Sequence, residues 1–219
     1  DAKFYQASSS EMYGNYPGEK NEVSPLVPRS PYGAAKVFGH HITNHYREAY
    51  NIFACCGILF NHESPLRGLE FVTRKITSTL ARIKFKKTNV LKLGNINAKR
   101  DWGFAGDYVE AMWLMLQQKN PNDYVISTGE SHSVEEFLSL ATEFCDLGDW
   151  HDFVEFDQDV MRPTDIEDLF GNSTKAQKEL NWKPKISFRE LVKMMVDHDV
   201  EYEKLYTNPL KFNKKPQGN

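Results

Sequence analysis

Short apolar runs alternate with longer amphipathic segments along this chain, and that alternation limits the fold more than any other feature of the sequence. Strands separated by helices form a parallel sheet covered by helices. The sequence therefore predicts an α/β fold with a doubly wound parallel sheet. Strands are expected near residues 3–7, 51–61, 89–95, 123–128 and 152–156, and helices near residues 31–50, 70–84, 106–117, 133–144, 173–180 and 187–206.

Charge and composition exclude several classes of protein. The 219 residues include 27 Lys and Arg against 30 Asp and Glu, so no basic field favours nucleic acid as the partner. No run reaches the ~18 to 20 apolar residues that span a bilayer, so we expect no membrane partner and a cytoplasmic location. The odd number of cysteines, Cys55, Cys56 and Cys145, is typical of reduced core residues.

The segment RSPYGAAK, residues 29–36, predicts the start of a helix. Ser30 is a favourable N-cap and Pro31 suits the first helical position. Tyr32 and Lys36 then share one face, four residues apart. The ammonium group and the positive end of the helix dipole both favour the phenolate, which makes Tyr32 a usable acid or base near neutrality.

The spacing Y-x-x-x-K is a weak signal by itself. Tyr16 and Lys20 match it too, but Pro17 and Gly18 between them argue against a helix there. The cap and the preceding strand distinguish the pair Tyr32 and Lys36 from an ordinary solvated pair.

A second candidate site, SSSEMYG at residues 8–14, follows the first expected strand. Ligands of doubly wound sheets bind beyond the carboxyl ends of the strands, where Ser9 and Glu11 are expected. Alternatively, the serines form a turn or cap the next segment.

Seven ordered motifs resemble the GDP-mannose 4,6-dehydratases, which belong to the extended short-chain dehydrogenase/reductase family. The resemblance covers nearly the whole chain except its tail. The motifs are YQASSSEMYG, PRSPYGAAK, GILFNHESPLRG, FVTRKI, LGNINAKRDWG, DYVEAMWLMLQ, and RPTDIEDLFGN with LNWKP.

This resemblance implies NADP as cofactor and GDP-mannose as substrate. Carbon 4 is oxidised, water is eliminated across carbons 5 and 6, and hydride returns to carbon 6 to give GDP-4-keto-6-deoxymannose. By resemblance, Tyr32 tuned by Lys36 is the base for the 4-hydroxyl, Glu11 removes the carbon 5 proton, and Ser9 hydrogen-bonds the 4-oxygen.

The resemblance also assigns binding residues. Besides Tyr32 and Lys36, the implied cofactor contacts are His62 and Arg67, beside which Leu66 replaces the Arg usual in the family. The implied substrate contacts are Asn61, Val72, Lys75, Arg100, Arg162 and Asp165. Asp165 is one methylene shorter than the usual Glu, and Val72 and Lys75 equally fit an amphipathic helix.

The implied domains follow from the same comparison. Residues 1–65 correspond to the later part of a Rossmann-type dinucleotide-binding domain, and residues 66–205 mainly to a smaller α/β sugar-nucleotide domain. Residues 104–128 return to the Rossmann sheet, and residues 206–219 are expected to be a flexible tail. The family associates as homodimers or homotetramers, so either state is expected here.

The Gly-rich dinucleotide fingerprint does not occur in this sequence. We expect that the chain is a segment of a longer dehydratase, because all four catalytic candidates are present. The alternative is a catalytically inactive binding module derived from such an enzyme. Another sugar-nucleotide dehydratase or epimerase is disfavoured by FVTRKI, KRDWG and NHESP.

Two further expectations concern single side chains. His41 and His45 are spaced as a helical metal pair, but no third ligand is evident, so no metal site is expected. Trp113 is expected to pack in the core together with Met115 of the same helix.

Overall fold

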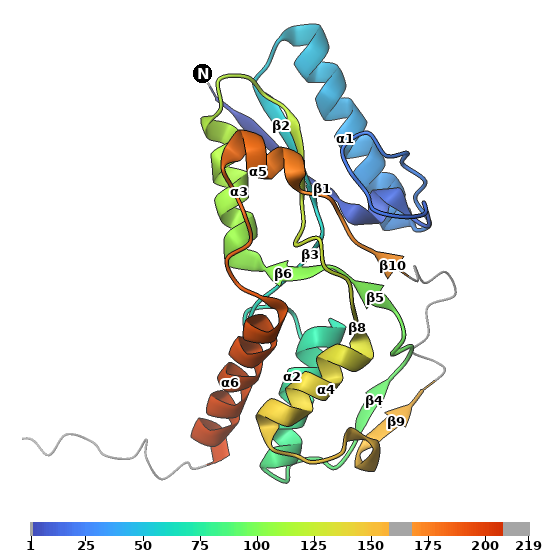
Figure 1. Ribbon diagram of the computed structural model, residues 1–219, viewed down its shortest axis with the longest axis vertical. Coiled ribbons are helices and arrows are strands. Elements are labelled where there is room, and N and C mark those ends of the chain that lie inside the picture. Colours follow the sequence, from blue (N-terminus) through green and yellow to red (C-terminus); the bar gives the residue numbers. More distant parts are fainter. Residues whose placement is uncertain (1, 158–167, 208–219) are drawn as a thin grey trace, which may run out of the picture.

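The computed structural model describes residues 2–157 and 168–207. It has two lobes, one above the other along the long axis of the molecule, joined by short strands (Figure 1). Among the described residues, no helix is both long and apolar enough to cross a lipid bilayer.

The upper lobe contains a three-stranded parallel sheet with the order β1-β2-β7. Its strands are β1 (Phe4–Ser9), β2 (Ala54–Leu59) and β7 (Asp123–Ile126). All six residues of β2 are buried because helices cover both faces of the sheet. The α/β class expected from the alternating pattern is confirmed.

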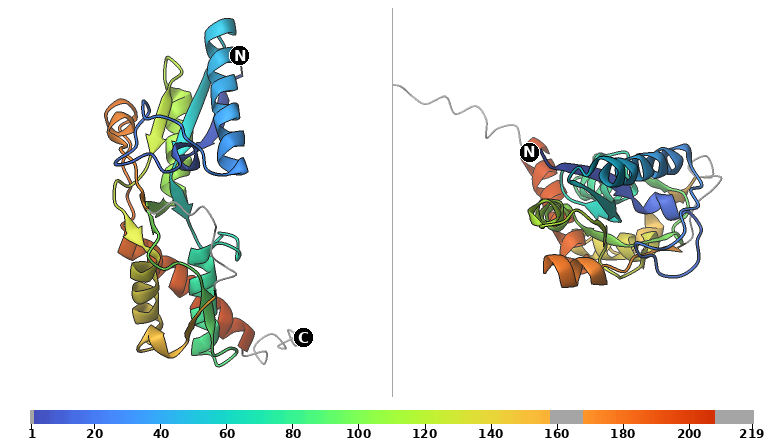
Figure 2. Two further views of the ribbon diagram at one scale, coloured as in Figure 1. Left: turned by 90° about the vertical axis from the view of Figure 1, so that its right-hand side faces the viewer. Right: turned by 90° about the horizontal axis from the view of Figure 1, so that it is seen from above.

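Three helices cover this sheet. Helix α1 (Pro31–Tyr50) lies against one face, while α3 (Ala105–Gln117) and α5 (Thr174–Leu180) lie on the other (Figure 2). The adjacent cysteines of β2 show the two faces: the Cys55 thiol faces Met115 of α3, and the Cys56 thiol faces α1. All three cysteines are buried free thiols, as predicted.

The lower lobe is built on three helices, α2 (Val72–Lys84), α4 (Val134–Cys145) and α6 (Phe188–Thr207). They share an apolar core that includes Ile76, Phe137 and Leu191. Strand β4 (Leu91–Leu93) pairs in parallel with β9 (Val154–Phe156) at the side of these helices, and the short 3-10 helix η2 (Trp150–Asp152) precedes β9.

Short strands connect the lobes. β3 (Asn61–Glu63) pairs with β6 (Trp102–Phe104), and β5 (Lys99–Arg100) lies between β10 (Asp168–Leu169) and β8 (His132–Ser133). Helix α5 packs on α3 and β7, with Ala176, Leu180 and Trp182 in the upper core. Residues 174–182 thus lie with the upper lobe, whereas the expected division returned only residues 104–128 to it.

The predicted helix starts are confirmed in detail. The Ser30 side chain accepts a hydrogen bond from the Gly33 N–H, with Pro31 at the first helical position. Ser133 and Glu136 form a reciprocal capping box at the start of α4. Helix α6 continues to Thr207, into the expected tail, and residues 208–219 lie outside the described part of the chain.

The prediction for Trp113 is wrong. Its side chain is 61% exposed, while Met115 of the same helix is fully buried. The inward face of α3 is formed by Tyr108, Ala111 and Met115, and Trp113 points away with Val109, one turn earlier.

Candidate functional site

The candidate site lies at the edge of the upper sheet where its three parallel strands end. Ser9, Leu59 and Ile126 lie side by side as the last residues of β1, β2 and β7. Ser9 ends one strand and Glu11 follows it, at the same edge at which Asn61 and His62 follow the next strand. Ligands bind outside this edge in doubly wound sheets.

The turn after β1 has a defined hydrogen-bonding pattern. Ser10–Tyr13 form a 3-10 helix, η1, for which the Ser9 hydroxyl oxygen accepts from the Glu11 N–H at 3.2 Å. The alternative role of the serines as a cap is thus present in the structure. Ser9 remains the last residue of β1 while it caps η1, and the Glu11 side chain is half-buried.

Two glycines allow the backbone to approach closely here. A Cβ atom on Gly33 would lie 2.8 Å from the carbonyl oxygen of Glu11. Glycine at this position therefore lets the first turn of α1, which carries Tyr32, rest against η1. Gly14 ends η1 with φ of +53°, and a Cβ there would lie 1.9 Å from the carbonyl oxygen of Val27.

Tyr32 and Lys36 share one face of α1, as expected. The Lys36 ammonium lies 5.5 Å from the centre of the Tyr32 ring and donates to the carbonyl oxygen of Ala7 at 2.8 Å. The phenol is 56% exposed. The structure thus brings these two side chains to the end of the strand that carries Ser9.

The second pair with the same spacing is arranged differently, as its Pro-Gly sequence predicted. Tyr16 and Lys20 lie in a loop, and Lys20 is buried, with its ammonium 3.3 Å from the carbonyl oxygen of Asp168. Burial lowers the pKa of Lys20. Backbone hydrogen bonds join Lys20 to Phe170 and Asn172, so this loop is tied to the segment that follows β10.

Asn61 and His62 lie in β3, directly after β2, with half-buried side chains. His62 Nδ1 lies 2.8 Å from the carbonyl oxygen of Phe60, and its ring packs against Tyr108 with the ring centres 5.1 Å apart. Burial lowers the pKa of His62, which favours the neutral ring.

Arg67 lies in the loop between β3 and α2. Its guanidinium stacks on the Phe71 ring at 3.5 Å and lies 3.3 Å from the Glu63 carboxylate. Burial raises the pKa of Glu63, while Arg67 and a hydrogen bond from Thr73 act in the opposite direction. The ion pair with Glu63 restrains the Arg67 side chain. That side chain is 24% exposed, so it remains accessible to an anionic ligand.

Arg74 anchors the same loop and was not among the expected residues. Its guanidinium donates to the backbone carbonyls of Pro65 and Arg67, and to Asp199 of α6 at 2.8 Å. Its place on the buried stripe of α2, beside Thr73, Ile76 and Thr77, is the signal that sequence reasoning overlooked.

The other expected substrate residues lie on two elements. Val72 packs against the lower core from the first turn of α2, and Lys75 is half-buried one turn later. Arg100 lies in β5 and donates to the carbonyl oxygen of Lys99. Within the described part of the chain, the Lys75 side chain forms no hydrogen bond with the other site residues. Arg162 and Asp165 lie outside the described residues.

Asp101, next to Arg100, was also missed by sequence reasoning. Its carboxylate is fully buried and accepts from the backbone N–H groups of Thr128, Gly129 and Gly171 and from the Thr128 hydroxyl. Burial raises its pKa, and these hydrogen bonds act against that shift. Asp101 joins three chain segments beside Arg100.

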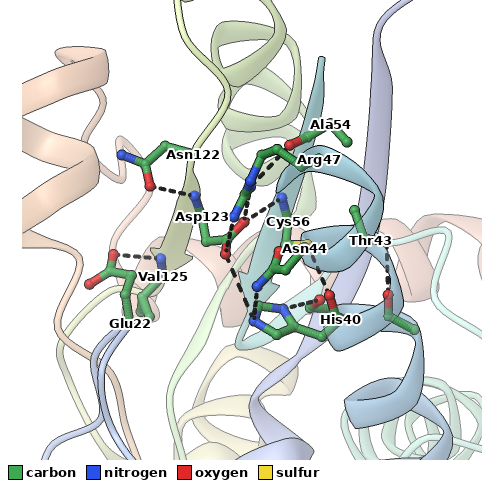
Figure 3. Close-up of polar contacts among 12 residues, drawn as sticks. Glu22, His40, Thr43, Asn44, Arg47, Ala54, Cys56, Asn122, Asp123 and Val125 are labelled. Atoms are coloured by element: carbon green, nitrogen blue, oxygen red, sulfur yellow. Dashed lines mark hydrogen bonds and ion pairs between the residues drawn. The ribbon is translucent and has the colours of Figure 1, made fainter. Parts of the chain in front are cut away.

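A buried polar cluster lies where α1 packs against β2 and β7 (Figure 3). The side chains of His40, Cys56 and Asp123 approach within 4.8 Å of one another, and Asp123 forms a two-pronged ion pair with Arg47 at 2.7 and 3.0 Å. Both Asp123 oxygens are therefore already engaged by a cation. His41 and His45, the expected helical pair, are exposed on another face of α1.

Known proteins resemble this chain in sequence. A family model described as GDP-mannose 4,6 dehydratase matches residues 1–195. GDP-mannose 4,6 dehydratase 1 of Arabidopsis thaliana is 57% identical over 202 residues, covering 92% of this chain and 56% of that protein. The human GDP-mannose 4,6 dehydratase is 49% identical over 226 residues, covering 94% of this chain and 60% of the relative.

Solved structures with the same fold are more distant in sequence. RMD from Pseudomonas aeruginosa, complexed with NADPH, has a TM-score of 0.81 at 20% identity, over 91% of this chain and 66% of that one. The dTDP-glucose 4,6-dehydratase of Bacillus anthracis, in complex with NAD, has a TM-score of 0.81 at 22% identity, over 94% and 63%. At this identity the likeness shows the extended Rossmann-type fold.

The chain spans 54 to 62% of the length of four curated relatives from a plant, an insect and a slime mould. The family model nevertheless matches the chain from its first residue into α6. By this match and by the identity to its relatives, the chain belongs to the GDP-mannose 4,6-dehydratase family.

Proposed function

We propose that this chain carries the catalytic residues and the sugar-nucleotide lobe of an enzyme that converts GDP-mannose to GDP-4-keto-6-deoxymannose. The observation that carries the proposal is the close approach of η1 and α1 at Gly33, which brings Glu11 and Tyr32 to the end of one strand. The relatives are GDP-mannose 4,6 dehydratases, and this supports GDP-mannose as the substrate.

The roles we propose follow from the chemistry of each side chain. Tyr32, beside the Lys36 ammonium, takes the proton of the sugar 4-hydroxyl. Glu11 removes the carbon 5 proton once a ketone at carbon 4 has made it acidic, and then passes a proton to the departing 6-hydroxyl. Ser9 hydrogen-bonds the 4-oxygen as its charge changes.

NADP is the cofactor that we propose, and when bound it would accept hydride from carbon 4 and return it to carbon 6. The side chains present fit an anionic dinucleotide: Lys36 and Arg67 offer cations, and Tyr32 and His62 lie at the strand ends beside them. We propose that these four residues hold its nicotinamide half.

For the sugar nucleotide, we propose contacts from Asn61, Val72, Lys75, Arg100, Arg162 and Asp165. Two phosphate groups need neutralising. Arg100 ends β5 just before Trp102, the residue of β6 that pairs with Asn61. The planar guanidinium suits phosphate oxygens.

We also propose that the chain associates with a second copy through α1. Large apolar side chains recur every four residues along its exposed face: Phe38, Ile42, Tyr46 and Tyr50. Sedimentation tests this proposal: Phe38→Asp should shift the protein to monomer, while Val23→Asp, in an exposed loop, should not. The three buried free thiols suit a reducing compartment such as the cytoplasm.

The test of the proposed activity is incubation with GDP-mannose and NADP⁺, followed by mass spectrometry. The expected product is lighter than GDP-mannose by one water. NAD⁺ at equal concentration tests the choice of cofactor. Failure of the whole protein that carries this chain to form product at saturating substrate and cofactor would contradict the proposed function.

A further inference from the structure

Two consecutive turns of α1 contact two consecutive residues of β1. Lys36 donates to the carbonyl oxygen of Ala7 at 2.8 Å. One turn later, His40 Nδ1 lies 3.0 Å from the Ser8 hydroxyl, and both partners are buried, at 7% and 3% exposure. Lys36 and His40 therefore both hydrogen-bond α1 to β1, one turn of the helix apart.

The neighbours of His40 determine which ring nitrogen carries its proton. The Asn44 amide nitrogen lies 3.3 Å from His40 Nε2, and the Asn44 amide oxygen lies 3.4 Å from the Cys56 sulfur (Figure 3). Burial raises the pKa of Cys56, so its thiol keeps a proton to donate to that oxygen. An amide nitrogen only donates, so Nε2 accepts and Nδ1–H donates to Ser8.

Charged groups face His40 from two elements, β7 and α1. Asp123 of β7 lies 3.9 Å from Nε2, and Arg47 of α1 neutralises that carboxylate. The exposed His41 adjoins the ring as well. Burial lowers the pKa of His40 most, Asp123 acts in the opposite direction, and His41 and Arg47 lower it further. The neutral ring thus lies between Ser8 of β1 and Asp123 of β7, and its Nδ1–H donates to Ser8.

Ser8 precedes the turn that presents the proposed catalytic groups. The next hydroxyl, that of Ser9, accepts from the Glu11 N–H and so fixes the start of η1. A shift of Ser8 relative to α1 would move Ser9 and Glu11 together relative to Tyr32. The hydrogen bond between Ser8 and His40 joins α1 to β1 directly before the turn begins.

We propose that His40 is a positioning residue, which sets the distance between the two halves of the catalytic site by donating from Nδ1 to Ser8. This inference rests on the proposed function for its catalytic consequence. Its structural part, the restraint of the segment from Ser8 to Tyr13, stands independently of turnover.

A matched pair of variants isolates the Nδ1 donor. In His40→Asn the amide falls near the position of Nδ1, and in His40→Gln it falls near that of Nε2, while both lose the ring. We expect His40→Asn to retain kcat within about threefold, and His40→Gln to lose about tenfold or more in kcat with little change in KM for GDP-mannose. A role in packing alone would give His40→Asn, which has the smaller side chain, a loss at least as large as that of His40→Gln.

Two further measurements complete the test. Ser8→Ala should reproduce the loss of kcat, and combining it with His40→Gln should add little, since both remove one hydrogen bond. Amide hydrogen exchange at residues 8–13 should accelerate in Ser8→Ala and His40→Gln but not in His40→Asn. The proposal would be overturned if exchange and kcat changed equally in the two His40 variants. It would also be overturned if the losses of kcat were additive in the double variant.

The exchange measurement separates this inference from the proposed function. Faster exchange in His40→Gln alone, in a protein without turnover, would support the restraint and contradict the proposed activity. Unchanged exchange together with normal turnover of GDP-mannose would overturn the restraint and leave the proposed function standing.

Discussion

Arg74 and Asp199 form a buried ion pair at 2.8 Å that joins α2 to α6. Asp199 also accepts from the Thr77 hydroxyl at 2.6 Å, and Arg74 donates to two backbone carbonyls of the loop that carries Arg67. The pair therefore links the packing of the lower lobe to the proposed cofactor-binding side chain.

Removing one member of this pair should destabilise the protein strongly. Arg74→Ala removes the guanidinium from the buried Asp199 carboxylate and leaves the Thr77 hydroxyl and the His198 ring as its partners, which costs ~3 to 5 kcal/mol. Chemical denaturation should show a lower free energy of unfolding by about that amount. The exposed pair of Arg189 and Glu143 provides the control, because Arg189→Ala should cost less than ~1 kcal/mol. Similar costs for the two variants would contradict the buried role.

Two glycines of α1 should respond oppositely to alanine. In Gly33→Ala the new methyl group meets the fixed carbonyl of Glu11 at 2.8 Å, so the proposed site must open and kcat should fall by about tenfold or more. In Gly39→Ala the methyl meets only the movable end of the Gln6 side chain. Gly39→Ala should therefore keep its activity and gain up to ~1 kcal/mol of stability from helix propensity. Equal activities of the two variants would refute the close approach as a requirement.

Two tryptophans provide a test of the packing. Trp182 is 2% exposed and donates to the carbonyl oxygen of Asp107, so Trp182→Ala should cost ~3 to 5 kcal/mol. Trp113 is 61% exposed, and Trp113→Ala should change stability by less than about 0.5 kcal/mol in this chain. Thermal and urea unfolding measure both. A large cost at Trp113 would mean that a partner or another chain segment covers it.

The error at Trp113 shows where the sequence predicts well and where it does not. The helix start at Ser30 was predicted because it depends on residues close together in the chain. Helix α3 is apolar on nearly all sides, in the run AMWLMLQ, so its periodicity does not identify the buried face. Only the contact with β2 and α5 determines it.

The residues of the candidate site likewise include some that the sequence predicts and some that it does not. Tyr32 and Lys36 follow from a helix start, and Ser9 and Glu11 from a strand end, so the sequence could place each pair separately. Their proximity depends on Gly33, whose partner is twenty-two positions earlier in the chain. The buried polar residues Asp101 and His40 were missed because their partners are distant in sequence, and no local pattern identifies such partners. Arg74 differs, because its place on the buried stripe of α2 is a local signal.

The free energy of unfolding should decrease as the pH is lowered, because the buried His40 becomes protonated. Burial lowers the pKa of His40 below its ordinary value of about 6.5, so the folded state binds the proton more weakly than the unfolded chain. Its contribution to stability is present above about pH 6.5 and is lost progressively below it, down to the lower folded pKa.

Urea unfolding between about pH 7.5 and 5.5 measures this dependence. His40→Asn lacks the titrating ring and should show a smaller decline, with the remainder arising in part from His62, whose pKa burial also lowers. If the wild type and His40→Asn declined in parallel, His40 would not be a source of the pH dependence.

The most direct test of the central claim is the fate of GDP-mannose in Glu11→Gln. The amide keeps the shape of the side chain but cannot remove the carbon 5 proton, whereas Tyr32 and Lys36 remain intact. We predict that absorbance at the NADPH band rises as carbon 4 is oxidised, while the dehydrated product falls by about a hundredfold or more. Glu48→Gln, exposed on α1, is the control and should behave as wild type. Full formation of the keto-deoxy sugar by Glu11→Gln would contradict the account.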